Sequence, residues 1–127
     1  MANIISQVPA FLYRQFFVTP QYPTTDCTGK TIIVTGANIG LGFEAVRHYV
    51  RLNASKVIIA CRSLEKGEAA KLDIEKSTKR TGVIDVWQLD LLNYDSVKAF
   101  AKRVDTLKRV DSIVENAGIA TVGAPYI

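Results

Sequence analysis

The stretch that decides the fold runs Thr31-Ile32-Ile33-Val34-Thr35-Gly36-Ala37-Asn38-Ile39-Gly40-Leu41-Gly42. Its first four residues are a β-branched run typical of a buried parallel strand. From Leu41 onward, apolar residues recur at helical spacing, at Ala45, Tyr49 and Leu52. A strand that turns into a helix through glycines directs backbone N–H groups and a helix N-terminus at one spot, which suits a pyrophosphate. The stretch therefore predicts a dinucleotide-binding turn.

The three glycines of this turn have the spacing T-G-x-x-x-G-x-G. A second register, Gly40-x-Gly42-x-x-Ala45, also satisfies the general G-x-G-x-x-G/A pattern, and both registers predict the same class of ligand. With the first spacing the chain resembles the short-chain dehydrogenase/reductase superfamily. The residues that we expect to contact the cofactor here are Gly36, Asn38, Ile39, Gly40, Leu41 and Gly42.

The next apolar run, Lys56-Val57-Ile58-Ile59-Ala60-Cys61-Arg62, predicts a strand that ends in a basic residue. An NAD-preferring protein of this type carries Asp or Glu about 20 residues after the glycines. A carboxylate repels a 2′-phosphate, whereas a guanidinium can hold it with two parallel hydrogen bonds. Arg62 therefore favours NADP, and Lys66, one helical turn later, adds charge. The alternative for both residues is a solvated surface position.

A third apolar run, residues 83–89, is followed by Asp90 and Leu91. In the superfamily that the chain resembles, an Asp at this place followed by an apolar residue contacts the adenine ring, so the resemblance implies this role for Asp90 and Leu91. Helix capping is the alternative role for Asp90. Asp95 is the better-placed N-cap of the following helix, because it lies closer to the start of the helical pattern.

The fourth run, Asp111-Ser112-Ile113-Val114-Glu115-Asn116-Ala117-Gly118, resembles the superfamily's Asn-Asn-Ala-Gly turn after strand four. Asn116, Ala117 and Gly118 match that turn, and Glu115 departs from it. The resemblance implies that Asn116 braces the central strands and lines the adenosine side of the cleft. Ser112 interrupts the apolar run and needs a hydrogen-bond partner if it is buried.

These runs predict a doubly wound α/β fold, a Rossmann-type parallel sheet truncated to about four strands in the order 3-2-1-4. We expect residues 28–127 to form the dinucleotide-binding half of one domain, with residues 1–27 as an apolar arm. The cofactor crevice would lie between strands one and four. The expected strands are 31–35, 56–61, 83–89 and 110–115, and the expected helices are 40–52, 63–80 and 95–108.

The resemblance implies an NADP-dependent oxidoreductase, similar to fungal and retinol-dehydrogenase-like members, acting on a small carbonyl or alcohol. In the superfamily the catalytic Ser and Tyr-x-x-x-Lys pair follow strands five and six, so we expect the catalytic half to be absent and assign no catalytic residue. Tyr94 and Lys98 have the spacing of that pair, but they precede the Asn116 turn and are interpreted as helix surface. The alternative is a non-catalytic nucleotide-binding or partner-binding remnant, which turnover would distinguish from an enzyme.

The N-terminal arm contains an apolar, aromatic segment from Pro9 to Val18. Pro9 suits a first helical position, and the prolines at 20 and 23 would end the helix. Arg14 interrupts the segment, and no run approaches the roughly 18 apolar residues that a membrane span needs. We expect the arm to pack on its own domain or on a sister subunit rather than on a membrane.

The composition is that of one globular domain: 127 residues, 48% hydrophobic, 22% charged, with a net charge of +4. The basic residues near 98–109 alternate with an apolar face and lack interleaved aromatics, so we expect a solvated helix face and no nucleic-acid partner. Two separated cysteines and one histidine predict no metal site and a reduced, cytoplasmic chain. An oligomer is expected only for the complete enzyme.

Overall fold

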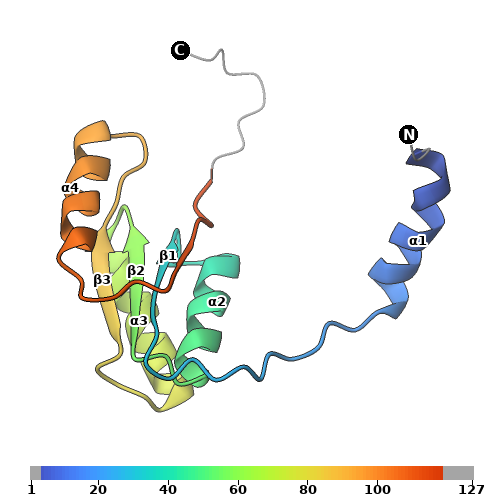
Figure 1. Ribbon diagram of the computed structural model, residues 1–127, viewed down its shortest axis with the longest axis horizontal. Coiled ribbons are helices and arrows are strands. Elements are labelled where there is room, and N and C mark those ends of the chain that lie inside the picture. The colour runs from blue at the N-terminus through green and yellow to red at the C-terminus, as the bar shows by residue number, and fades with distance from the viewer. Residues whose placement is uncertain (1–3, 119–127) are drawn as a thin grey trace.

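The computed structural model describes residues 4–118, which form a parallel sheet with helices on both faces, preceded by a separate helix (Figure 1). The sheet order is β3-β2-β1-β4, and all neighbouring strands are parallel. The predicted Rossmann-type sheet and its 3-2-1-4 order are therefore confirmed. The strands are β1 (Thr31–Thr35), β2 (Lys56–Cys61), β3 (Ile84–Gln88) and β4 (Ser112–Val114).

Helices α2 and α3 cover one face of the sheet, and α4 covers the other. This is the arrangement that crossover connections between parallel strands produce. The described helices are α1 (Ile4–Phe17), α2 (Gly40–Arg51), α3 (Leu64–Thr78) and α4 (Tyr94–Asp105).

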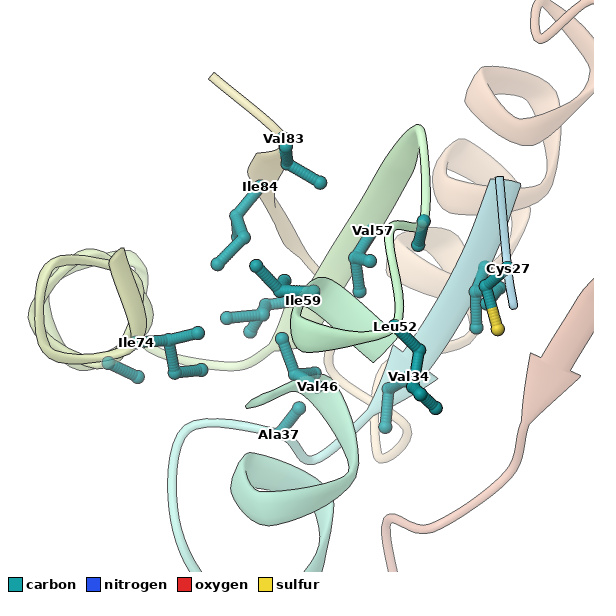
Figure 2. Packing of buried hydrophobic residues seen from close by; sticks show 14 of the residues in the cluster. Cys27, Val34, Ala37, Val46, Leu52, Val57, Ile59, Ile74, Val83 and Ile84 are labelled. Carbon is teal, nitrogen blue, oxygen red and sulfur yellow. The ribbon is translucent and has the colours of Figure 1, made fainter. Parts of the chain in front are cut away.

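The larger part of the core lies between the sheet and the α2–α3 layer (Figure 2). Val34 and Ile59 project from adjacent strands, and Val46 from α2 and Ile74 from α3 meet them. All four side chains have 0% exposure. Because both faces of a parallel sheet are covered, its strands are continuous apolar runs, which is why the bounds of β1 and β2 match the prediction.

The opposite face is covered less completely. Trp87 of β3 packs edge-on against Phe100 of α4, with ring centroids 5.9 Å apart. The Arg103 guanidinium lies over the Trp87 indole, with 4.2 Å from its Cζ to the ring centroid. Arg103 is therefore not the purely solvated side chain that the sequence predicted. No described residue of α4 is fully buried.

Several element ends differ from the prediction for local reasons. Asn93, not Asp95, is the N-cap of α4, because its side chain accepts hydrogen bonds from the backbone N–H groups of Asp95 and Ser96. That helix ends at Asp105, since the Thr106 N–H bonds back to the Arg103 carbonyl and tightens the last turn. Lys79, with φ of 56°, ends α3.

The fourth strand is shorter than the predicted 110–115 and pairs with β1 through three residues. Ser112 is exposed, so its hydroxyl requires no partner inside the protein.

The N-terminal helix differs most from the prediction. It begins at Ile4, so Pro9 lies inside it rather than at its first position. From Val8 to Phe17 its large apolar side chains are exposed; Phe16, for example, is 76% exposed, and Figure 1 shows α1 apart from the sheet and its helices. Packing on its own domain is therefore not found among the described residues. Over the same residues, no helix has the length and apolarity to cross a membrane.

The segment that joins α1 to the sheet contacts α2. The Tyr22 ring lies under the Arg51 guanidinium, with 4.2 Å from the ring centroid to the Arg51 Cζ. Arg51 Nη2 also donates a hydrogen bond to the Pro23 carbonyl at 2.7 Å. These contacts fix the end of the arm to the α2 surface, whereas residues 7–17 of α1 are exposed.

We predict that Ile59→Ala lowers the free energy of unfolding by about 2–5 kcal/mol, because it opens a cavity beneath α2 and α3. Urea denaturation followed by circular dichroism would measure the change. Leu72→Ala on the exposed side of α3 is the matched control and should change stability by no more than about 0.5 kcal/mol. Equal effects of the two substitutions would contradict the assigned core.

Candidate functional site

The Thr35 hydroxyl joins the turns that follow β1 and β4. Its Oγ1 accepts hydrogen bonds from the backbone N–H groups of Asn116 at 3.1 Å and Ala117 at 3.0 Å. It also lies 3.4 Å from the Val114 carbonyl oxygen, to which it donates. A hydroxyl has one donor and two acceptor sites, so all three are used. Thr35 is 8% exposed, and the bonds therefore form largely out of water.

The Asn116 side chain completes this junction. Its Nδ2 donates to the Thr35 carbonyl at 3.1 Å and to the Gly36 carbonyl at 3.3 Å. The Gly36 N–H in turn donates to the Ala60 carbonyl at 2.8 Å. The carboxyl ends of β4, β1 and β2 are thus linked in sequence, as the bracing role expected for Asn116 requires.

Each of the three glycines in this turn is required, or tolerated, for a different structural reason. Gly36 has φ of 65°, and a Cβ there would lie 2.9 Å from the Ala117 Cα. A Cβ on Gly42 would lie 2.6 Å from the Asn116 Nδ2, so this glycine permits the close approach of α2 to the junction. Gly40 has φ of 67° and no other group within 4 Å of a Cβ, which leaves the space beside it open.

Helix α2 begins at this open space without a side-chain cap. Its N-cap residue is Ile39, which has an extended backbone and an aliphatic side chain that cannot accept a hydrogen bond from the N–H groups of the first turn. The first turn also carries no acidic residue. Uncapped N–H groups and the positive end of the helix dipole favour an anion, so the start of α2 suits the pyrophosphate of a dinucleotide.

A cleft of about 530 Å³ extends along the carboxyl ends of the strands beside this helix. Most of the residues predicted for the site line it, while Gly40, Leu41, Gly42 and Lys66 do not. Four lining residues were not predicted from the sequence, namely Ala60, Cys61, Leu89 and Leu92, and three of them lie in or next to apolar strands. The lining comprises Gly36, Asn38, Ile39, Ala60, Cys61, Arg62, Leu89, Asp90, Leu91, Leu92, Asn116, Ala117 and Gly118.

Two charged side chains, Arg62 and Asp90, belong to this lining. The Arg62 side chain is exposed and forms no hydrogen bond or ion pair with residues 4–118. Asp90 Oδ1 accepts a hydrogen bond from the Leu92 N–H at 3.0 Å, so it stabilises the turn before α4 rather than the helix itself. A cleft with one free guanidinium is suited to a ligand that carries phosphate.

Cys61 lines the same cleft at the end of β2 and is 3% exposed. Burial raises the pKa of its thiol, despite hydrogen bonds that act in the opposite direction. The thiol is therefore neutral at pH 7, and its Sγ donates to the Ser63 carbonyl at 3.2 Å. Cys61 acts here as a small apolar wall of the cleft and not as a nucleophile.

Tyr94 and Lys98 lie on α4, outside the cleft lining. Tyr94 is 75% exposed, and the Lys98 ammonium lies 4.9 Å from the centroid of its ring and 3.0 Å from the Asp95 carboxylate. This placement agrees with the interpretation of the pair as helix surface. Over the described residues, no three His, Cys, Asp or Glu side chains are grouped to hold a metal ion.

A glycine turn at the start of α2, a switch point between β1 and β4 and a cleft beyond the strand ends are together the arrangement of dinucleotide-binding folds. The family model of the short chain dehydrogenases matches residues 30–125, and the chain belongs to that family.

Its curated relatives include a short chain dehydrogenase/reductase, dmxR8, of Cryptosporiopsis, 60% identical over 112 residues that cover 87% of this chain and 35% of the relative. The short-chain dehydrogenase anuD of Penicillium roqueforti is 51% identical over 112 residues, covering 88% of this chain and 29% of the relative. This chain therefore spans about a third of the length of these relatives.

The fold is also similar to that of a short chain dehydrogenase from Shigella flexneri, solved in complex with NADP. The two are 32% identical with a TM-score of 0.65, and the match covers 76% of this chain and 41% of that one.

We predict that Thr35→Val, which keeps the shape of the side chain, lowers the free energy of unfolding by about 2 kcal/mol, because the Ala117 N–H loses its acceptor and the Asn116 N–H keeps only the Val114 carbonyl. Thr31→Val is the matched control, since the Thr31 hydroxyl makes no hydrogen bond within residues 4–118. Chemical denaturation of both variants would measure the difference. A Thr35→Val variant as stable as the control would show that the hydroxyl is not needed to hold β4.

Proposed function

We propose that this chain provides the cofactor-binding half of an NADP-dependent oxidoreductase, which transfers hydride between the nicotinamide and a small carbonyl or alcohol. The observation that carries the proposal is the Arg62 guanidinium, which lines the cleft and has no partner among the described residues. It follows β2, where an NAD-preferring protein carries a carboxylate.

Arg62 supports NADP over NAD for an electrostatic reason. Its fork of N–H donors can bind the 2′-phosphate with two charge-assisted hydrogen bonds, and nothing in the described structure competes for them. Lys66, exposed in the first turn of α3, adds a second positive charge near the same turn. The Shigella flexneri relative, whose structure contains NADP, supports the same cofactor.

The other lining residues support the remaining parts of the cofactor. The uncapped start of α2, with Gly36, Asn38 and Ile39 beside it, would hold the pyrophosphate. Asp90 and Leu91 would contact the adenine, and the turn at 116–118 would line the adenosine side. When bound, the cofactor supplies or accepts the hydride, and the contribution of these residues is to bind and orient it. The first three residues of α2, Gly40, Leu41 and Gly42, follow this turn directly but do not line the cleft.

The cleft lining of the described residues contains no tyrosine, serine or lysine. The lining therefore supports a role in cofactor binding for this part of the chain, and the substrate and its proton transfer belong to the proposal for the whole enzyme. A nucleotide-binding module without turnover is the second candidate, favoured by the same composition of the lining. A carbonyl-reduction assay with NADPH separates the two.

We predict that the chain binds NADPH more tightly than NADH, and that Arg62→Asp raises the NADPH Kd by about tenfold to a hundredfold, the equivalent of one charge-assisted hydrogen bond or more. The NADH Kd should change little, because NADH has no 2′-phosphate. Fluorescence titration with each cofactor measures both constants.

Lys102→Asp is the matched control for that substitution, because it makes the same charge change on the exposed surface of α4. It should leave the ratio of the two Kd values unchanged. Equal affinity of the unmodified chain for NADPH and NADH would contradict the assignment of Arg62.

A further inference from the structure

Gly67 lies in the first turn of α3, where the helix passes directly over β2 and β3. It is buried, and a Cβ at this position would lie 2.4 Å from the Val86 Cγ1 and 2.7 Å from the Cys61 Sγ. Both distances are far inside normal van der Waals contact. Glycine is a poor helix former, so its presence inside a helix calls for a packing reason, and this close approach provides one.

Hydrogen bonds hold the backbone on both sides of Arg62. The Gly67 N–H donates to the Ser63 carbonyl at 3.0 Å, and the Ser63 side chain caps the helix by accepting from the Lys66 N–H at 3.3 Å. On the strand side, the Cys61 carbonyl accepts from the Leu89 N–H at 2.9 Å. Arg62 is thus the one residue between a fixed strand end and a fixed helix cap.

We propose that Gly67 is a positioning residue for cofactor specificity: by letting α3 approach β2 and β3 closely, it sets where the Arg62 side chain enters the cleft. The inference rests on the proposed function, because it concerns the preference for NADP. Gly67 itself does not line the cleft, so it acts only through the position of Arg62.

A side chain at position 67 cannot be accommodated by a shift of the sheet. Val86 pairs with Ile59, and both neighbours of that pair are also in register, so the backbone beneath the helix is fixed by the ladder. Ile59 is fully buried under the same helix layer. The two atoms that the new Cβ would meet belong to side chains with little freedom to turn away, because Val86 is β-branched and the buried Cys61 Sγ donates to the Ser63 carbonyl. We therefore expect the first turn of α3 to move outward and to carry the Ser63 cap and Arg62 with it.

The test compares NADPH and NADH affinities of the full chain and of Gly67→Ala. We expect the NADPH Kd to rise about tenfold, because the guanidinium loses its contact with the 2′-phosphate, and the NADH Kd to rise by less than about twofold. A purely structural role would weaken both affinities alike. Asp73→Ala, on an exposed position of the same helix, is the matched control and should change neither.

A second variant removes the closest clash. Adding Val86→Ala to Gly67→Ala takes away the Cγ1 atom that the new Cβ would meet, and should restore part of the NADPH preference. Val86→Ala alone serves as its control and should keep the preference.

The two hypotheses fail differently. If the unmodified chain shows no preference for NADPH, the proposed function is wrong. If it does prefer NADPH and Gly67→Ala keeps that preference, or loses both affinities equally without recovery in the double variant, Gly67 is not a positioning residue.

Discussion

The candidate site depends on the Thr35 hydroxyl, whose one donor and two acceptor positions are all used in hydrogen bonds. The fourth strand pairs with β1 through only three residues and lies at the edge of the sheet, so its ladder alone is a weak attachment. Thr35 adds three hydrogen bonds to the segment from Val114 to Ala117, and Asn116 returns two more to the turn after β1. Together they bring the two turns face to face, and the cleft exists because they meet.

Most of the predicted phosphate-binding surface is backbone, and side chains matter there mainly by their absence. Gly36 and Gly42 allow the Asn116 turn and α2 to approach each other, whereas Gly40 leaves the start of α2 open. Gly67 has the same role at the next turn, where α3 approaches β2 and β3. The positive charge of the cleft comes from Arg62. Its guanidinium is available to bind a ligand because it has no partner among residues 4–118.

The sequence predicted the sheet well because each inner strand is a short apolar run with both faces buried, so β1 and β2 have the predicted bounds. Features that depend on side-chain hydrogen bonds to the backbone could not be predicted from the spacing of apolar residues. Asn93 is the N-cap of α4 in place of Asp95 because its side chain accepts hydrogen bonds from the N–H groups of Asp95 and Ser96. Leu92 lines the cleft because of the turn that Asp90 stabilises.

The predicted start of α1 was wrong because Pro9 lies inside the helix, where the low helix propensity of proline makes it unexpected.

The most direct test of the account is a ¹H–¹⁵N NMR titration of the chain with NADPH. The predicted result is a set of amide shifts confined to the turns at 36–42, 61–63, 90–92 and 116–118, with the amides of α1 and of the Tyr22 segment unchanged. These turns are far apart in the sequence, and residues of all four line the cleft. Shifts spread over α4 or the arm, or no shifts at saturating NADPH, would contradict the assignment of the cleft as the cofactor site.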